Sequence, residues 1–250
     1  MQLVDNPVNK FSNILQNPES DVIKKYISIF ELKSLNTSQS VQALIDNFEN
    51  LDNSDLLKHE VTYALGQMNT DFKYLIKPFL VKVLDTENEY PVVRHEAAEG
   101  LSNFCEEDSE LLQLFQKYSE SNINEKKYGL QFAGTREPAA PFEIEEIQSV
   151  KLLSELLNRK YWEKTNNLFR HEICFVLGQI SKNANESIMQ LKETSADQEE
   201  NEIVRHEALS AYSSIADDKE FLKLFVNDPS RIVRESAVVA VGLIDYWNNK

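Results

Sequence analysis

Apolar residues recur at helical spacing along nearly the whole chain. One stripe comprises Val61, Ala64, Leu65 and Met68, a second Ala97, Ala98, Leu101 and Phe104, and a third Val176, Leu177 and Ile180. Residues three or four positions apart share one face of an α-helix, whereas the period of two that is typical of strands is hard to find. The pattern predicts an all-α fold built of antiparallel helix pairs.

Turn and capping signals separate these apolar stretches. They are Asn17-Pro18, Asn53-Ser54, Pro91, Asn183 and Asn227-Asp228-Pro229. The segment GTREPAAP, residues 134–141, cannot continue a helix because of its prolines. We therefore expect an N-terminal half at residues 1–120, a linker region at 121–148 and a C-terminal half at 149–250. Residues 1–17 and 247–250 are expected to be end caps or loose ends.

Two pairs of segments resemble each other along the chain. LLKHEVTYALGQM around His59 resembles LFRHEICFVLGQI around His171, and VVRHEAAEGLSNF around His95 resembles IVRHEALSAYSSIA around His206. Equivalent positions are 112 and 111 residues apart, so a unit of two repeats has been duplicated. Repeats of this size predict a helical solenoid in two halves, in which each repeat buries its apolar face only by stacking on its neighbours.

Every histidine of the chain is followed by glutamate. The four dipeptides are His59-Glu60, His95-Glu96, His171-Glu172 and His206-Glu207. A glutamate follows any given residue with a chance of roughly one in ten. It is therefore improbable that all four histidines are followed by glutamate by chance. Neutral imidazole beside carboxylate is a ligand set that suits iron, manganese or zinc. The eight residues are therefore the predicted metal site, and no catalytic residue beyond them is predicted.

Two end segments carry the helix pattern without the dipeptide. They are YISIFELKSL at residues 26–35 and DPSRIVRESAVVAVGLID at 228–245, where Glu235 and Ser236 stand in the places of His206 and Glu207. The helix pattern therefore survives without His-Glu, so the dipeptide is not needed to form or pack the helix. End repeats of this kind are expected to be atypical caps.

A helical projection places the imidazoles away from the core stripe of their own helix. We therefore expect them on the exposed concave surface, with His59 beside His95 and His171 beside His206. A small residue follows each histidine seven positions later; these residues are Gly66, Ser102, Gly178 and Ser213. Their small size allows a ligand or the opposing half to approach closely, or it serves the packing of the helices. The basic residue before each dipeptide either supports the ligand carboxylates or pairs with a neighbouring repeat; these residues are Lys58, Arg94, Arg170 and Arg205.

The chain carries a formal net charge of -15 and a pI near 4.8. Nucleic acid and anionic membranes would be repelled, so a basic partner is expected. Two cysteines, Cys105 and Cys174, form no CxxC pair, and no apolar run is long enough to span a bilayer. These features favour a cytoplasmic protein, with Cys174 as a buried structural thiol rather than a residue near the metal.

Two half-sites of two histidines and at least one carboxylate match twice the ligand set that leaves open positions on ferrous iron for dioxygen. Facing each other, they would form a dinuclear site. HExxH, the zinc-protease pattern, is absent. Eight potential ligands exceed what two irons need, so one carboxylate in each half is free to bind substrate. Ligand type alone leaves iron and manganese both open.

At these motifs the chain resembles the deoxyhypusine hydroxylase family. The resemblance covers most of the sequence and includes the LKHE and LFRHE segments, both VRHEA segments and the closing NDPSRIVRES. The resemblance implies an all-α, HEAT-like helical-repeat superhelix in two pseudo-symmetric halves, whose motifs hold a dinuclear iron centre. It also implies hydroxylation by dioxygen of the aminobutyl side chain of deoxyhypusine in translation initiation factor 5A, forming hypusine. The electron donor is not identified.

The resemblance also implies roles for single residues. It assigns His59, His95, His171 and His206 as iron ligands, together with Glu96 and Glu207. Glu60 and Glu172 become candidates for binding the cationic amines of the substrate. A carboxylate is suited to that task, and a strongly acidic surface would attract a basic protein substrate.

The sequence departs from the family before the third motif. The family has a further helical repeat there, but this chain has only residues 149–169, SVKLLSELLNRKYWEKTNNLF. A different class of function is a non-catalytic HEAT-type scaffold, or a relative of the phycobilin lyases that share a VR-x-EA pattern. In that case the dipeptides would line a peptide-binding groove. Their two-fold symmetric placement favours the metalloenzyme.

Overall fold

The computed structural model describes residues 6–51, 54–105, 143–180 and 185–248, and it describes the side chains of most of these residues. Those residues form helices and no strand, which confirms the all-α prediction. They belong to two compact units, Met1–Ile123 and Asn124–Lys250, each with its own internal contacts. The predicted linker, 121–148, lies mostly outside the described residues, as does the segment 134–141, and the predicted domain boundaries stay predictions.

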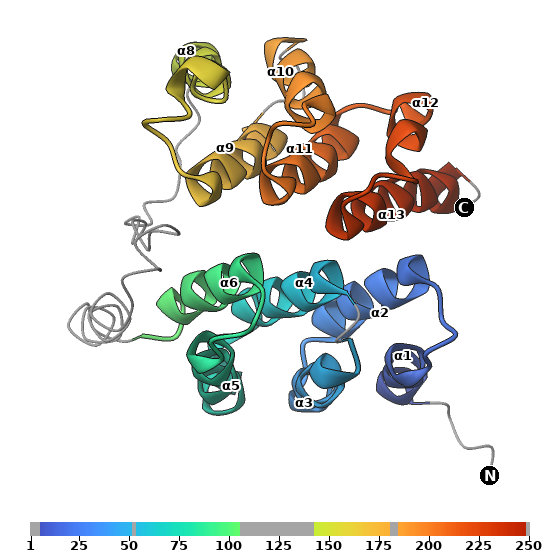
Figure 1. The fold of residues 1–250 in the computed structure, drawn as a ribbon. Helices are drawn as coiled ribbons and strands as arrows, with labels where there is room; N and C mark the ends of the chain where they lie inside the picture. Colours follow the sequence, from blue (N-terminus) through green and yellow to red (C-terminus); the bar gives the residue numbers. More distant parts are fainter. Residues whose placement is uncertain (1–5, 52–53, 106–142, 181–184, 249–250) are drawn as a thin grey trace. The chain divides into compact units, whose positions relative to one another are not determined.

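The N-terminal unit is a stack of helix pairs in two layers (Figure 1). One layer holds α1, α3 and α5, and the other holds α2, α4 and α6, with α4 packed between α2 and α6. The helices are α1 (Pro7–Gln16), α2 (Val22–Leu35), α3 (Ser38–Asn47), α4 (Asp55–Gly66), α5 (Lys73–Asp85) and α6 (Pro91–Ser102). Short 3-10 turns, η1 (Phe48–Leu51) and η2 (Thr70–Phe72), precede α4 and α5.

The C-terminal unit repeats this arrangement. Here α8, α10 and α12 alternate along the chain with α9, α11 and α13, and α11 packs on both α9 and α13. The helices are α8 (Glu143–Leu156), α9 (Asn167–Ile180), α10 (Asn185–Ala196), α11 (Glu202–Ile215), α12 (Lys219–Leu222) and α13 (Arg231–Asn248), with 3-10 turns η4 (Arg159–Tyr161) and η5 (Lys223–Phe225). Each unit is thus the kind of helical repeat stack that the internal duplication predicts.

Side-chain caps fix where these helices begin. The Ser54 hydroxyl accepts a hydrogen bond from the Leu57 amide at 3.1 Å, at the start of α4. Asn201 accepts one from the Ile203 amide at 3.0 Å, at the start of α11. A cap satisfies an amide that has no partner within the helix, and typically stabilises it by about 1 kcal/mol. Pro91 occupies the first position of α6, where its missing N–H costs nothing.

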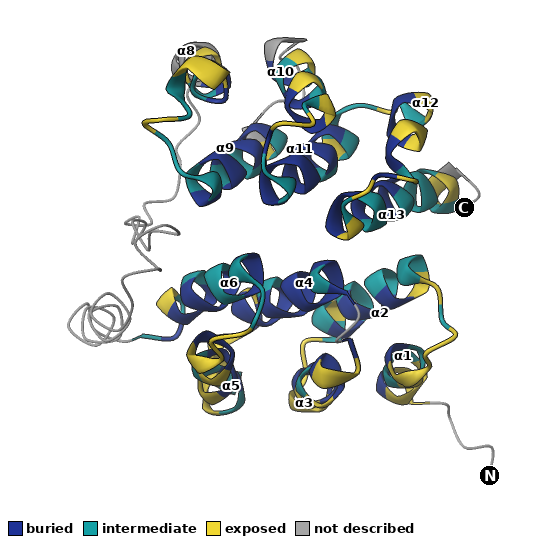
Figure 2. Cartoon of the chain, in the orientation of Figure 1, coloured by how far each residue is buried: buried dark blue, intermediate teal, exposed yellow. Residues whose placement is uncertain are grey.

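The predicted apolar stripes lie in the core. All residues of the first two stripes are buried, along α4 and α6 and just beyond their ends. In the third stripe Leu177 is buried and Val176 is half-buried, and the side chain of Ile180 lies outside the described part of the chain. Figure 2 shows the same contrast within the N-terminal unit, where α4 is mostly buried and α1, α3 and α5 carry exposed faces. Helical periodicity therefore identified the packed faces correctly.

The four His-Glu motifs lie on α4, α6, α9 and α11, and the helices without the motif, α2 and α13, lie next to them. The predicted cap repeats are thus confirmed as helices. Residues 7–16, which the sequence left as a cap or loose end, form α1 and pack against α2. The Asn6 side chain caps this helix and Pro7 begins it, a start signal that an interpretation based on apolar stripes overlooked.

Candidate metal centre

In the N-terminal unit, the first motif meets the second across two neighbouring helices. His59 of α4 places its Nε2 3.2 Å from Oε1 of Glu96 on α6. The other ring nitrogen, Nδ1, lies 3.5 Å from Oε1 of Glu60, the next residue in the chain. His59, Glu60 and Glu96 are all buried. One imidazole therefore has a carboxylate at each of its nitrogens, and one of these carboxylates comes from the neighbouring repeat.

The C-terminal unit has the same arrangement. His171 Nε2 of α9 lies 3.6 Å from Glu207 Oε2 of α11, and His171 Nδ1 lies 2.9 Å from Glu172 Oε1. The rings of His171 and His206 lie side by side, with centroids 5.4 Å apart. The prediction that His171 stands beside His206 is confirmed.

These separations suit a bound metal ion. First-row metals hold imidazole nitrogen and carboxylate oxygen at about 2.1 Å, so two neighbouring ligands of one ion are about 3 Å apart. The separations of 3.2 Å and 3.6 Å between the histidine Nε2 and the neighbouring carboxylate lie near that value. A carboxylate at the opposite nitrogen fixes the ring orientation, as in metal sites generally. The donor set in each unit therefore fits a metal ion bound through Nε2.

One further carboxylate lies at the second motif and was missed by the sequence interpretation. Single ligand atoms of His95, Glu96 and Glu99 lie within 4.8 Å of one another on α6. The spacing of four residues between His95 and Glu99 places both on one helix face, which is the signal that could have found it. The equivalent residue of the C-terminal unit is Ser210, so this carboxylate belongs to one half only.

The expectation that the imidazoles are exposed is wrong for three of them. His59, His171 and His206 are buried, and His95 is half-buried. A projection of one helix considers only the core of that helix. It does not account for the helices on either side, and α4 and α11 are each flanked by two others of their own unit. Burial strengthens electrostatic interactions at the ligands, because water no longer screens them.

The carboxylates around His59 change its protonation. Burial opposes the charged form, but the nearby Glu96 and Glu60 carboxylates outweigh this effect and raise the pKa of His59 well above its ordinary value. A metal ion binds the neutral ring and must displace that proton. Metal uptake by this half-site is therefore expected to release a proton.

Three of the four basic residues before the dipeptides form ion pairs with neighbouring repeats, one of the two roles considered from sequence. Lys58 Nζ lies 2.7 Å from Glu89, Arg170 Nη2 2.8 Å from Glu200, and Arg205 Nη2 2.6 Å from Asp228. All three acids precede the second helix of the next repeat. Arg94 donates two hydrogen bonds to the Leu84 carbonyl, at 3.1 Å and 3.0 Å. The three acids, Glu89, Glu200 and Asp228, were not identified from sequence.

The small residues behind the motifs allow close helix packing. A Cβ on Gly66 would lie 2.8 Å from the Cα of Gly100 on α6, and a Cβ on Gly178 would lie 2.8 Å from the Cβ of Ala211 on α11. Both distances are too short for any real contact. Of the two roles that the sequence left open for these positions, packing is therefore the one seen at both glycines.

Two further expectations concern the thiols and the membrane. Cys174 is fully buried, and burial raises the pKa of its thiol well above the ordinary value, so it is the inert structural cysteine that was expected. Among the described residues, no helix is long and apolar enough to cross a bilayer.

Comparisons with known proteins point to one group of relatives. The chain is 30% identical to deoxyhypusine hydroxylase of Danio rerio over 295 residues, covering 98% of this chain and 94% of the relative. It is likewise 30% identical to the Homo sapiens protein of that name, over 98% of this chain and 93% of the relative. No protein-family profile matches the sequence.

A solved structure agrees with these relatives. The structure of human deoxyhypusine hydroxylase in complex with glycerol matches with a TM-score of 0.74 and 27% identity, and the match covers 96% of both chains. The alignment with the zebrafish relative extends over 295 residues, more than the 250 of this chain, so the relative is longer. Whether the difference in length lies before the third motif, as the sequence predicts, stays a prediction.

Proposed function

Because this chain belongs to the deoxyhypusine hydroxylase family, we propose that it hydroxylates the deoxyhypusine residue of translation initiation factor 5A with dioxygen, at a dinuclear iron centre. The observation that carries the proposal is the paired arrangement of the motifs. In each unit a histidine places Nε2 beside the carboxylate of the next repeat, at 3.2 Å in one unit and 3.6 Å in the other.

The residues that would hold the irons are the four histidines with two of the glutamates. In the N-terminal unit these are His59, His95 and Glu96, and in the C-terminal unit His171, His206 and Glu207. When bound, the irons supply the activation of dioxygen. The chain supplies buried ligands held on packed helices, and a surrounding from which bulk water is largely excluded.

Glu60 and Glu172 differ from the other two glutamates in geometry. Each lies at the Nδ1 of the histidine before it, at 3.5 Å and 2.9 Å, rather than at the Nε2 of a histidine in another repeat. This supports their assignment to the cationic amines of the substrate, since their carboxylates are not needed at Nε2. An overall charge of -15 would steer a basic protein substrate towards the chain. The cytoplasmic location of the protein stays a prediction.

Metal content per chain tests the proposal. Protein purified without chelator should contain about two irons, measured by elemental analysis, and should hydroxylate a deoxyhypusine-bearing substrate. His59→Ala and His171→Ala should each lower the iron content and abolish turnover. Glu235→Ala is the matched control, because Glu235 occupies the position of His206 in the cap repeat and lies outside the proposed site. It should keep both irons.

The same measurement can overturn the proposal. A wild-type chain that takes up no metal after reconstitution with ferrous iron is no diiron hydroxylase. The non-catalytic helical-repeat scaffold would then be the better description. A chain that binds manganese in preference to iron and turns over with it would correct only the identity of the metal.

A further inference from the structure

Each unit holds a buried ion pair directly beside its first histidine. In the N-terminal unit the pair is Lys58 with Glu89, whose side chains are each 9% exposed. In the C-terminal unit it is Arg170 with Glu200, at 4% and 1% exposure. The cations are 112 positions apart and the acids 111, so the two pairs are equivalent under the internal duplication.

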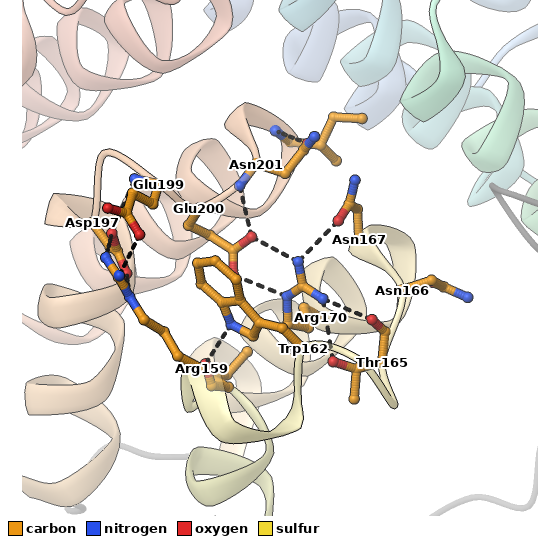
Figure 3. A network of polar contacts seen from close by, with 12 residues as sticks. Arg159, Trp162, Thr165, Asn166, Asn167, Arg170, Asp197, Glu199, Glu200 and Asn201 are labelled. Atoms are coloured by element: carbon orange, nitrogen blue, oxygen red, sulfur yellow. Dashed lines mark hydrogen bonds and ion pairs between the residues drawn. The ribbon is translucent and has the colours of Figure 1, made fainter.

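The cations also lie on aromatic rings at similar distances. Lys58 Nζ lies 4.6 Å from the centre of the Phe48 ring, and the guanidinium carbon of Arg170 lies 5.1 Å from that of Trp162 (Figure 3). In the C-terminal pair all five N–H donors of Arg170 are used. They bond both oxygens of Glu200, the carbonyl and hydroxyl oxygens of Thr165, and the side chain of Asn167. The Arg170 side chain is thus held in one orientation.

The acids hold the start of the helix that carries the ligand carboxylate. Glu89 lies two residues before α6 and accepts a hydrogen bond from the Tyr90 amide at 3.0 Å. Glu200 lies two residues before α11 and accepts one from the Asn201 amide at 2.6 Å. Seven residues after each acid comes the glutamate, Glu96 or Glu207, that faces the histidine Nε2.

The ion pair and the ligand contact therefore connect the same two helices. On α4 the connected residues are Lys58 and His59, and their partners are Glu89, just before α6, and Glu96 on α6. A helix that slides by one residue moves by about 1.5 Å. Such a shift would displace the carboxylate from its place beside Nε2 by a distance about half as long as the 3.2 Å contact itself. The ion pair fixes the register on which that separation depends.

We propose that Lys58–Glu89 and Arg170–Glu200 are positioning pairs, which set the spacing between the histidine and the carboxylate of each metal half-site. The inference rests on the proposed metal centre. None of the four residues ligates the metal. They act through the neighbouring ligands, as outer partners of metal sites do when they hold ligands in place.

The experiment uses Co²⁺ as the probe, titrated into the metal-free full-length chain and followed by its visible absorption, which reports ligand geometry. Glu200→Gln should weaken Co²⁺ binding by about 10- to 100-fold and change the spectrum. Glu199→Gln is the matched control: it is the same substitution one residue away, at a side chain that is 72% exposed and pairs with Arg159. This control should bind Co²⁺ like the wild type.

A second comparison separates positioning from general packing. Arg170→Lys introduces the residue that the N-terminal unit has at the equivalent position, Lys58, and retains the charge opposite Glu200. It should keep the wild-type spectrum, although it loses the bonds to Thr165 and Asn167. Should Glu200→Gln not fold, Glu89→Gln provides the test in the other unit, with the exposed Glu87→Gln as its control.

The possible results lead to different conclusions. If the wild type binds Co²⁺ and Glu200→Gln or Glu89→Gln binds it equally well with the same spectrum, the positioning proposal is wrong and the metal centre stands. If the wild type binds no metal, the proposed function fails, and the positioning role fails with it. If Glu200→Gln and Arg170→Lys both lose the spectrum, the five bonds of the guanidinium, and not the ion pair, hold the register.

Discussion

The two units make the same contacts at equivalent positions with different residues. The motif helices approach through Gly66 and Gly100 in one unit, and through Gly178 and Ala211 in the other. Near these contacts, Asn103 donates to the Gly66 carbonyl at 2.8 Å, and Ser214 donates to the Gly178 carbonyl at 3.4 Å. The duplication has therefore retained the geometry of the paired helices more strictly than the side chains that produce it.

The four dipeptides are among the residues that did not diverge between the units. Lysine replaces arginine in the ion pair and glycine replaces alanine at the helix contact, but no histidine or glutamate of a motif is exchanged. Substitutions that preserve packing are tolerated where only the helix distance is needed. The proposed metal ligands would have no such freedom, because donor type and position both determine metal binding.

The units also differ in where the cap repeat lies. In the N-terminal unit the cap, α1 and α2, precedes the motif helices along the chain, whereas in the C-terminal unit the cap, α12 and α13, follows them. Within the described residues, α8 and η4 are the elements before α9 in the C-terminal unit. Among the described residues, the motif-bearing pairs are thus the part that both units share in the same order.

The largest effect should come from replacing the motif glutamates by alanine. These glutamates form two classes, those at the Nε2 of a histidine in another repeat and those at the Nδ1 of the histidine before them. Glu96→Ala and Glu207→Ala remove the carboxylates that lie at Nε2, so iron content and turnover should both be lost. Glu60→Ala and Glu172→Ala should keep iron and weaken substrate binding instead, seen as a raised KM. Elemental analysis and steady-state kinetics of all four variants distinguish the classes.

The four variants are controls for one another, because each class contains one residue from each unit. Loss of iron from both Glu60→Ala and Glu172→Ala would refute the division of labour, and would indicate that the carboxylate at Nδ1 is needed to orient the ring. Loss in one unit alone would show that the units differ in function despite their similar geometry.

A smaller effect is expected at the C-terminal cap, where Arg205 is bound by both oxygens of Asp228 at 3.2 Å and 2.6 Å. Burial would raise the pKa of Asp228, but the Arg205 guanidinium outweighs it and lowers that pKa below its usual range. Asp228→Asn leaves a buried arginine without its counter-ion and should lower the free energy of unfolding at neutral pH by about 3 kcal/mol.

The sign of the pH dependence follows from the lowered pKa. The ionised Asp228 stabilises the fold fully above its unfolded pKa of about 3.9, and this contribution is lost as the pH falls through the lower folded pKa. Urea unfolding of wild type and Asp228→Asn should therefore differ most at neutral pH and converge in acid. A difference that stays constant down to the acid end would contradict the role of the charge.

Much of this architecture could be predicted from sequence. The helical stripes and the cap helices follow from apolar spacing, and the duplication follows from the similarity of the segments around the His-Glu motifs. The assignment of the eight motif residues to a metal site stays a prediction. The partners Glu89 and Glu200 could not be predicted. They lie 31 and 30 residues after their cations, in a chain with 41 acidic residues. The lengths of the intervening loops determine which of these acids lies beside the cation, and the sequence pattern does not reveal it.

Burial of the imidazoles was the other failure, and its cause is physical. The angle around a helix axis separates the face packed on the core of its own pair from the opposite face. It contains no information about the next repeat, which contributes Glu96 to His59 and His206 to His171. Local periodicity therefore predicts the elements, whereas contacts between repeats require the register of the stack.

The smallest effect should appear at the helix contacts, where the two units can be compared directly. Gly66→Ala places a methyl group against the Gly100 backbone, and Gly178→Ala places one against the Ala211 side chain and backbone. Overpacking of this kind typically costs about 1 to 3 kcal/mol, opposed by the better helix propensity of alanine, about 1 kcal/mol. Both variants should therefore lower the urea midpoint of unfolding modestly.

The matched controls are Gln67→Ala and Gln179→Ala, which change exposed neighbours at equivalent positions. They should leave the urea midpoint unchanged. If the glycine variants were as stable as these controls, the helices could separate without cost, and close approach would not be what the duplication preserved.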